Sequence, residues 1–481
     1  MRLSLLASLL LPFALTGCSL LLDVEPDCDA ARDCNGYRCN AELTGCFNIC
    51  AAETDCTAGY ACDEPSQSCR QIADLEAEPI ALAAVPTWGE EFALGTGGSL
   101  LSTEFGLVVG GSEGLGLARF STAGALLASS PEPAPFGLDR LAQPNPAGPR
   151  FLPSVGRALP STVAGLSDAA LLFGWAEPSA DRNRIFVARR TIGEGQAVSA
   201  PLLLRDASSQ ASLSQISFAA GPDLVMALWR EQSGVSSELR AMPLAADSLS
   251  PILSAASRLT GSNEVAASPV ALRLGERWGA LYLSSELGAR TVRVIGLESD
   301  ASQLGELDLN TPVPNAVELG DLVATETASG AAAAYTQLEG GQKRLRGLLL
   351  PATAVAALGD PAQTATSGPT FDVSEGTASI SKPAIASVDG EVAIAWLSIG
   401  EDRARSLMLR RFNSAGVALS PAGVVVSDAG GTVIDLKLAA TVNGYALLWF
   451  TRDNNETKGF GRPLGREGAG ASGGGSTTGC A

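Results

Sequence analysis

The sequence predicts an all-β fold for most of its 481 residues, and three observations support this prediction. An extended segment, a turn and an apolar run that ends in an aromatic residue recur along the chain from about residue 85 onward. Asp-Gly and Asn-Gly pairs, which favour tight hairpin turns, stand between the extended segment and the apolar run in the clearest copies. The composition is 46% hydrophobic with 53 glycines, which is typical of a turn-rich globular protein.

The repeat is clearest at residues 383–396, where the turn Asp389-Gly390 precedes an apolar run ending at Trp396. A second clear copy has its turn at Asn443-Gly444 and ends at Trp449. The closing aromatic recurs at intervals of 54, 53, 53, 61 and 53 residues, at Trp175, Trp229, Tyr282, Tyr335, Trp396 and Trp449. Residues 106–109 extend the pattern backward and give seven copies. The run before each aromatic is apolar on both faces, which is typical of a buried inner strand.

A unit of about 53 residues accommodates four short strands with their loops. Because such a unit cannot bury its own hydrophobic face, it must stack on its neighbours, and four-stranded units arranged radially form a β-propeller. Seven copies between residues 79 and 465 resemble a seven-bladed β-propeller, without a Trp-Asp, kelch or Asp-box signature. Tandem β-sandwiches with two copies per domain are the alternative. In a propeller, ring closure is expected to pair residues 79–84 with residues 460–464.

The N-terminus predicts export and lipid anchoring. A basic start and an apolar run over residues 3–15 fit a signal peptide and are too short to span a bilayer. The segment Leu15-Thr16-Gly17-Cys18 resembles the lipobox of bacterial lipoproteins, which implies removal of residues 1–17 and acylation of Cys18, palmitate included. Ser19 resembles the signal for sorting to the outer membrane. The sequence leaves open whether the protein then faces the periplasm or the cell surface. A plain signal peptide with a chance cysteine is the alternative.

Eight cysteines predict a small disulfide-rich module over residues 28–70, joined to the anchor by a tether over residues 18–27. They fall into two similar units of about 22 residues, Cys28, Cys34, Cys39 and Cys46, and then Cys50, Cys56, Cys62 and Cys69. Units this short need disulfides to fold, with three possible pairings in each. A zinc module is the rival, but the chain has no Cys-x2-Cys pair and no histidine. The pattern resembles cysteine-rich modules of bacterial surface lipoproteins and, loosely, the Dickkopf-type fold.

The composition also excludes classes of function. A net charge of −18 disfavours nucleic acid as a partner. The absence of histidine excludes every catalytic triad that needs an imidazole, and we expect no cofactor and no metal site. The tail over residues 466–481 is rich in Gly, Ser and Thr and is expected to be disordered. It ends near Cys480, which is left over as a free thiol or as one half of an intermolecular bridge.

Two short motifs resemble catalytic signatures without their usual context. Residues 110–114 match the Gly-x-Ser-x-Gly nucleophile elbow, which needs a following helix and a histidine. Residues 379–382 match Ser-x-x-Lys, but we expect them at the entry to a blade and not on a helix. Neither motif is expected to be catalytic.

An arginine occurs in the predicted third strand of every copy, at Arg119, Arg189, Arg240, Arg293, Arg346, Arg410 and Arg462. If these side chains share one face, their guanidinium groups form a binding surface for an anionic ligand, since Arg binds carboxylates bidentately. The alternative is that each arginine pairs with a neighbouring Asp or Glu. Offsets of 8 to 14 residues from the aromatic weaken the idea of a regular ring.

From these observations we expect a membrane-anchored envelope lipoprotein that is not an enzyme and that binds a protein or a glycan as a non-catalytic scaffold. The alternative is a propeller-type polysaccharide hydrolase or lyase, which works with Asp and Glu alone and needs two carboxylates roughly 5–10 Å apart on inner strands. The apolar runs taken as inner strands argue against that alternative. A structural envelope component without a soluble ligand is a third possibility.

Overall fold

The computed structural model describes the strands between residues 39 and 191 and most of residues 199–465. Strands dominate these residues, and the one helix among them is α1 (Ala352–Leu358). The prediction of an all-β fold is confirmed. The signal segment, the tether with Cys18, and the tail with Cys480 lie outside the described residues.

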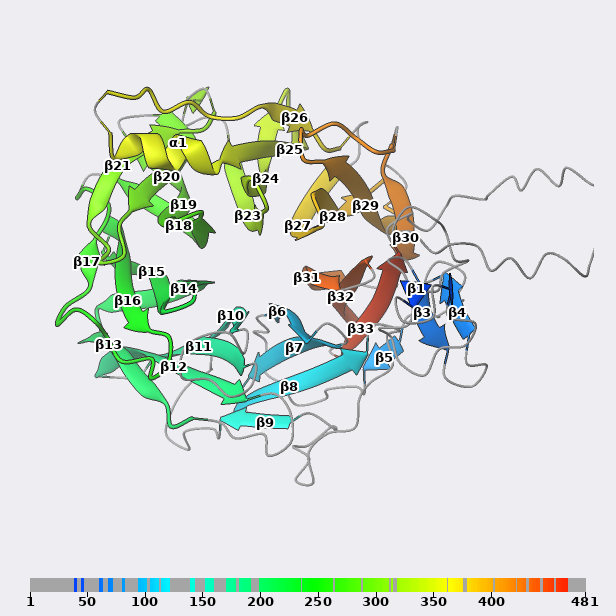
Figure 1. The fold of residues 1–481 in the computed structure, drawn as a ribbon, viewed down its shortest axis with the longest axis horizontal. Helices are drawn as coiled ribbons and strands as arrows, with labels where there is room; N and C mark the ends of the chain where they lie inside the picture. Colours follow the sequence, from blue (N-terminus) through cyan, green and yellow to red (C-terminus); the bar gives the residue numbers. More distant parts are fainter. Residues whose placement is uncertain are drawn as a thin grey trace, which may run out of the picture.

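The main strands described group into seven sets, called blades 1 to 7, which stand around a common axis (Figure 1). Blades 3 and 4 share one sheet, because β16 and β18 pair at Ser237 and Val265. Blade 1 contains β6 (Leu94–Leu101), β7 (Glu104–Gly111), β8 (Gly114–Ser121) and β9 (Asp139–Ala142). Blade 2 contains β10 (Leu152–Leu159), β11 (Ala170–Pro178), β12 (Arg182–Thr191) and β13 (Leu202–Ser208). Blade 3 contains β14 (Ala211–Ala220), β15 (Leu224–Ser233), β16 (Ser236–Ala245) and the short β17 (Ser257–Arg258).

Blade 4 contains β18 (Val265–Leu274), β19 (Arg277–Glu286), β20 (Ala289–Leu297) and β21 (Gln303–Asp308), with the short β22 (Val313–Pro314) beside β20. Blade 5 contains β23 (Leu319–Thr327), β24 (Gly330–Glu339), β25 (Gln342–Pro351) and β26 (Thr370–Asp372). Blade 6 contains β27 (Ser379–Val388), β28 (Glu391–Ile399), β29 (Arg405–Asn413) and β30 (Val424–Asp428). Blade 7 contains β31 (Thr432–Thr441), β32 (Gly444–Asp453), β33 (Glu456–Gly465) and β5 (Ile80–Leu82).

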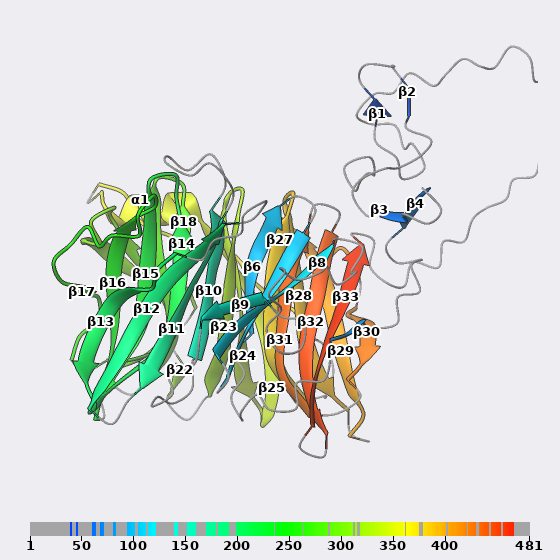
Figure 2. The ribbon, with the colours of Figure 1, turned by 90° about the horizontal axis from the view of Figure 1, so that it is seen from below.

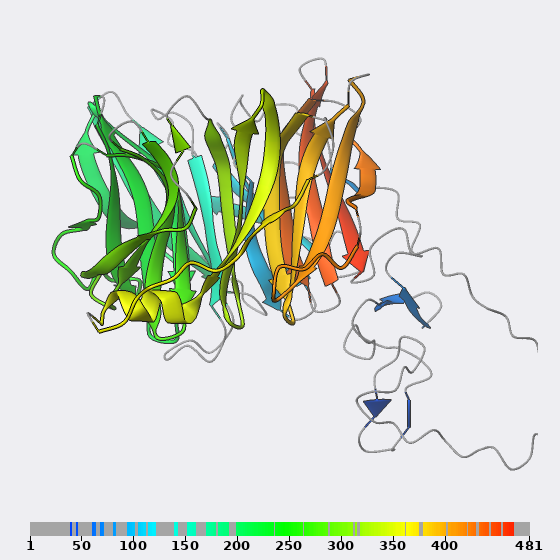
Figure 3. The ribbon, with the colours of Figure 1, turned by 90° about the horizontal axis from the view of Figure 1, so that it is seen from above.

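The ring is closed at two levels. The innermost strands contact one another in the order β6, β10, β14, β18, β23, β27 and β31, and β31 contacts β6 again. At the rim, β5 from the start of the ring pairs antiparallel with β33, with Ala81 opposite Phe460. This pairing confirms the predicted closure. Figures 2 and 3 show the strands of the blades running from one face of the ring to the other.

The apolar run that ends in the aromatic is the second strand of each blade, not the innermost one. The innermost strand is the extended segment that precedes the turn, as in β27, which is joined to β28 by the Asp389-Gly390 turn. The interpretation of the apolar runs as inner strands is therefore wrong. These runs are apolar on both faces because the neighbouring blades cover both faces of the second strand, so that Trp229 and Trp449 are almost fully buried.

The one long interval between aromatics has a local cause, and one predicted turn residue lies in a strand. The one long interval between aromatics contains α1, which follows β25 and contacts β20 and β21 of blade 4. Gly296 leaves room for this contact, because a Cβ there would lie 3.1 Å from Leu358. Gly444, predicted as a turn residue, instead opens β32 opposite Thr441.

Two small hairpins lie within the cysteine-rich region. β1 (Cys39–Asn40) pairs with β2 (Gly45–Cys46), and β3 (Tyr60–Asp63) pairs with β4 (Ser68–Gln71). The register places Cys39 opposite Cys46 in the first hairpin and Cys62 opposite Cys69 in the second. The two units thus repeat in backbone geometry, and disulfide formation among the eight cysteines stays a prediction.

Within the part of the chain that the structure describes, no helix has the length and apolarity needed to cross a membrane.

Candidate functional site

Four consecutive innermost strands share a β-bulge at the same register. In β14, β18, β23 and β27, two residues stand opposite the single recurring aromatic of the second strand. The first bulge residue is left-handed in every case, with φ between 49° and 55°, at Gln215, Ser268, Asp321 and Lys382. Because a left-handed backbone is unfavourable for a residue with a Cβ, four such positions in register mark a specified feature.

In each bulge, one residue packs into the core and the other reaches solvent. The second residue is buried in each strand, as Ile216 and Leu322 illustrate. The first residue is polar and reaches solvent at the innermost strand, and Gln215, Asp321 and Lys382 are exposed. The bulges therefore present an amide, a hydroxyl, a carboxylate and an ammonium group on neighbouring strands around the axis.

A hydrogen bond links two of these bulges across the blade boundary. The backbone N–H of Ser268 donates to Oε1 of Gln215 at 3.0 Å. Three residues further along β18, the N–H of Ala271 donates to the hydroxyl of Ser217 at 2.9 Å. Side chains of blade 3 thus satisfy backbone donors at the edge of blade 4. The array of bulge residues, here called the axial ring, is consequently fixed to the frame of the propeller.

The fifth member of the axial ring is Asp435 on β31. In blade 7 the extra residue is Ile434, and Asp435 stands opposite Phe450, one residue from the level of the other bulges. Its Oδ1 accepts a hydrogen bond from the N–H of Leu436 at 2.9 Å, and its Oδ2 lies 3.6 Å from Nζ of Lys437. Asp321 has a looser environment, because Thr336 donates to its Oδ2 at 3.4 Å. Two carboxylates therefore stand on innermost strands, with Lys382 on the strand between them.

Residue numbering contains a signal for this ring that the sequence interpretation missed. Each member lies 14 residues before the aromatic of its own copy, at Gln215, Ser268, Asp321, Lys382 and Asp435. Lys382 also closes the Ser-x-x-Lys motif, which lies on β27 as expected for a blade entry. The Gly-x-Ser-x-Gly motif lies at the β7–β8 hairpin, where Gly111 is opposite Gly114, and so lacks the strand-to-helix geometry of a nucleophile elbow.

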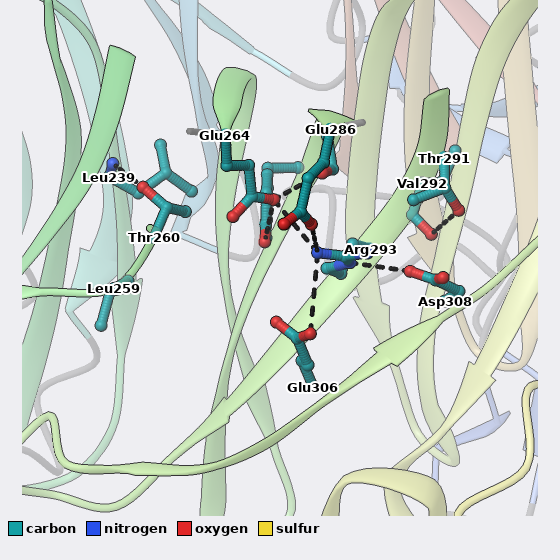
Figure 4. A network of polar contacts seen from close by, with 12 residues as sticks. Leu239, Leu259, Thr260, Glu264, Glu286, Thr291, Val292, Arg293, Glu306 and Asp308 are labelled. Carbon is teal, nitrogen blue, oxygen red and sulfur yellow. Dashed lines mark hydrogen bonds and ion pairs between the residues drawn. The ribbon is translucent and has the colours of Figure 1, made fainter. Parts of the chain in front are cut away.

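A buried carboxylate organises a network of polar contacts in blade 4 (Figure 4). Glu264 precedes β18, and only 5% of its side chain is exposed. The hydroxyl of Tyr282 donates to its Oε1 at 2.8 Å, and the hydroxyl of Ser284 donates to the same oxygen. NH1 of Arg293 lies 3.3 Å from that oxygen and 3.3 Å from Oε2 of Glu286.

Arg293 compensates an acidic neighbourhood. Its Nε donates to Asp308 at 2.7 Å, and Glu306 lies 3.7 Å from NH1. Burial alone disfavours its charged form, but the hydrogen bond to Asp308 and the surrounding negative groups raise the pKa of Arg293. Burial, followed by the charge of Glu264, also raises the pKa of Tyr282. Tyr282 therefore remains a protonated donor, and the network holds the aromatic that faces the Ser268 bulge.

The predicted arginines all lie on the third strand of their blades, from β8 to β33. Arg240, Arg293 and Arg346 stand directly opposite the aromatic residue of the second strand, in blades 3, 4 and 5. Each pairs with carboxylates of its own blade: Arg240 with Glu238, for example, at 2.8 Å. These three arginines therefore match the alternative in which each arginine pairs with a neighbouring Asp or Glu.

Three further arginines bind carbonyl groups of adjacent blades. Arg189 of blade 2 donates to the carbonyls of residues 246 and 247, which follow β16. Arg410 of blade 6 donates to the carbonyl of Val373 at 3.1 Å, and Arg462 of blade 7 donates to the carbonyl of Val426. The side chain of Arg119 lies outside the described residues. Arg189, Arg410 and Arg462 thus tie neighbouring blades together, whereas Arg240, Arg293 and Arg346 pair within their own blades.

No group of three or more His, Cys, Asp or Glu side chains that could hold a metal ion occurs among the described residues.

Neither a protein-family model nor a curated protein sequence matches the chain. Solved structures are similar in fold at low sequence identity. An α-L-arabinanase of Penicillium chrysogenum in complex with arabinobiose is 12% identical, covering 71% of this chain and 99% of its own, with a TM-score of 0.43. An α-L-arabinofuranosidase from Lactobacillus brevis is 10% identical, covering 54% of this chain and 93% of its own, with a TM-score of 0.32.

A neuraminidase-like protein of subtype N10 from a little yellow-shouldered bat isolate is 10% identical, covering 71% of this chain and all of its own, with a TM-score of 0.38. At these identities the similarity concerns the fold alone.

These comparisons overturn two expectations, that the protein is a non-catalytic scaffold and that it is not an enzyme. The structure supplies the physical reason for the error. The apolar runs form the second strands, and the strands at the axis carry Asp321, Lys382 and Asp435.

Replacement of Arg293 by methionine tests the role of the buried network. Arg293→Met leaves Glu264 buried without its cation, and loss of one partner of a buried ion pair costs about 3–5 kcal/mol. Arg346→Met is the matched control, because Arg346 occupies the same register in blade 5 but pairs with the more exposed Glu339 and Asp372. It is expected to cost about 1 kcal/mol or less. Chemical denaturation of both variants measures the difference, and equal losses would contradict the assignment.

Proposed function

We propose that the protein is a membrane-anchored enzyme that cleaves a glycan at the axis of its propeller, using the carboxyl groups of Asp321 and Asp435. The observation that carries this proposal is the axial ring: polar side chains on innermost strands, four of them at one register in an unfavourable backbone conformation and Asp435 one residue away. Strained polar positions and bulges concentrate at active sites. A purely structural inner edge has no need of exposed Asp321 and Lys382.

Glycosidic bond cleavage needs two carboxyl groups, one acting as an acid and the other as a nucleophile or base. Asp435 is oriented by Leu436 N–H and Lys437, which suits the group that must attack or activate water from a fixed position. Asp321 is exposed and receives one long hydrogen bond from Thr336, which leaves it able to exchange a proton with the leaving oxygen. Because the chain contains no histidine, acid–base chemistry of this kind falls to carboxyl groups.

The remaining ring members suit a substrate rich in hydroxyl groups. The exposed amide of Gln215, the hydroxyl of Ser268 and the ammonium group of Lys382 offer donors and acceptors to such a ligand. Lys382 has no ion-pair partner among the described residues, and its strand β27 contacts both carboxylate-bearing strands, β23 and β31. It is therefore available to a substrate oxygen or to a carboxylate of the substrate.

The sequence supports the location of this activity. The lipobox-like segment ending at Cys18 supports removal of the signal peptide and attachment to a membrane through lipid, and Ser19 supports the outer membrane. Two or three acyl chains hold a protein on a bilayer nearly permanently. The eight cysteines between Cys28 and Cys69 would then form a disulfide-stapled module between the lipid and the enzyme, in an oxidising compartment.

Substitution of the two carboxylates tests the activity. We expect the purified mature protein to release reducing ends from at least one member of a panel of plant and bacterial polysaccharides. Asp321→Asn and Asp435→Asn should each lower turnover by about 100-fold or more, since a positioned acid or base contributes roughly 10²–10⁴-fold. Asp372→Asn is the control, because Asp372 is exposed on the outer strand β26. Unchanged turnover in both carboxylate variants would refute the assignment of the active centre.

Substitution of the anchoring cysteine tests the location. Cells that express the native chain should incorporate labelled palmitate into it, and the protein should sediment with outer membranes. Cys18→Ser should abolish labelling and release the protein in soluble form, whereas Cys480→Ser should leave both unchanged. Labelling that persists in Cys18→Ser would contradict the anchor.

A further inference from the structure

A second polar site lies at the rim of the propeller, away from the axis. A cavity of about 260 Å³ opens between β13 of blade 2, β16 of blade 3 and the segment before β17. One wall is polar, with Arg205, Asp206, Arg240 and Ser254, and the other is apolar, with Leu204 and Met242. Its volume lies below the roughly 300 Å³ at which pockets for drug-sized ligands begin, so it suits one small unit of a larger molecule.

The polar wall contains buried atoms whose hydrogen-bonding capacity is unused. Oδ1 of Asp206 and Nε of Arg240 are buried without a hydrogen-bond partner. Such atoms are uncommon in folded proteins, and they mark places where a water, an ion or a ligand completes the structure. One of the two atoms is an acceptor and the other a donor, so the missing partner must offer both a donor and an acceptor.

The charge around the cavity is opposite in sign to that of the whole molecule. Two separate sets of ion pairs lie around the cavity: Arg182 and Arg184 with Asp206, and Arg205, Arg240 and Arg258 with Glu231 and Glu238. Each set has one more arginine than carboxylates, so both are cationic on a protein whose net charge is −18. A local excess of guanidinium groups in a cavity favours an anionic ligand, which the rest of the surface repels.

The two arginines that line the cavity are already oriented by the protein. Arg205 is fixed by a bidentate contact with Glu231, with Nε at 3.1 Å and NH2 at 2.7 Å from the two carboxylate oxygens. Arg240 is fixed by Glu238 through NH2, while its Nε stays 3.7 Å from Glu231, too far for a hydrogen bond. Neither carboxylate engages NH1 of either arginine in a hydrogen bond, so both guanidinium groups retain donors for a ligand.

We propose that this rim cavity binds a carboxylate-bearing sugar unit, such as a uronate of an acidic polysaccharide. The carboxylate would face Arg205 and Arg240, a neighbouring hydroxyl would donate to Asp206, and the apolar face of the sugar ring would lie against Leu204 and Met242. A sulfate ion lacks the hydroxyl donor that Asp206 requires. The inference rests on the proposed function and adds a class of substrate to it: an anionic glycan held at the rim while another part of the chain reaches the axis.

Direct binding measurements test the site independently of cleavage. Tri-galacturonate is titrated into the mature full-length protein by calorimetry, with neutral galactotriose and inorganic sulfate as comparison ligands. We expect tri-galacturonate to bind at least tenfold more tightly than either. Arg205→Gln, Arg240→Gln and Ala255→Phe, which fills the cavity without changing charge, should each weaken that binding at least tenfold. Arg346→Gln, at the same register as Arg240 in blade 5, should not.

Equal affinity for galactotriose or sulfate would overturn the proposal, as would tri-galacturonate binding that survives both Arg240→Gln and Ala255→Phe. The Asp321→Asn variant separates this proposal from the catalytic one, because it removes the axial acid and leaves the rim intact. Tri-galacturonate binding without any glycan cleavage by the native protein would refute the catalytic proposal alone. Glycan cleavage without tri-galacturonate binding would refute the rim site alone.

Discussion

Each blade depends on its neighbours to cover both faces of its second strand. Residues of these strands, such as Trp229, Tyr282 and Trp449, are almost fully buried, and burying one large apolar side chain contributes about 1.5–3 kcal/mol. The other strands of a blade flank its second strand only at the edges, so the neighbouring blades cover its two faces and the hydrophobic clusters extend from one blade into the next. The closed ring follows from this requirement, since closure leaves no second strand uncovered.

The same requirement assigns the polar chemistry of the chain to the two edges of each blade. With the second strand reserved for apolar contacts, hydrogen-bonding and charged groups occupy the innermost strand and the outer strands. At the inner edge they form the axial ring, in which Gln215 caps the bulge of the next blade. At the outer edge they form the arginine network, in which Arg189 and Arg410 tie neighbouring blades and Arg205 and Arg240 line a cavity.

Much of the fold could be predicted because buried strands and turns require particular residue types at a fixed spacing. The recurring aromatic and the Asp389-Gly390 turn reveal the repeat, and the closure of β5 on β33 follows once the repeats are arranged in a ring. The position of the site could not be predicted in the same way. An apolar run is equally compatible with a first or a second strand, and the choice decides whether the axis is lined by Ala and Val or by Asp321 and Lys382.

The left-handed backbone conformation at the axis also could not be predicted from the sequence. Nothing in the residue types of Gln215, Ser268, Asp321 and Lys382 predicts a left-handed φ, which non-glycine residues rarely adopt. The bulge arises because two residues must face one bulky aromatic, a constraint that exists only once the strands are paired. The pairs in the outer strands are easier to anticipate, since an arginine directly opposite a strand position finds carboxylates within reach on the same blade.

The most direct test of the account is a crystal structure of the Asp321→Asn variant with an oligosaccharide that the native enzyme cleaves. The account predicts that the sugar lies at the axis, with its glycosidic oxygen between position 321 and Asp435 and with hydroxyl groups bound to Gln215 and Lys382. An oligosaccharide bound only at the outer strands, with the axial ring unoccupied, would contradict the assignment of the axis as the active centre.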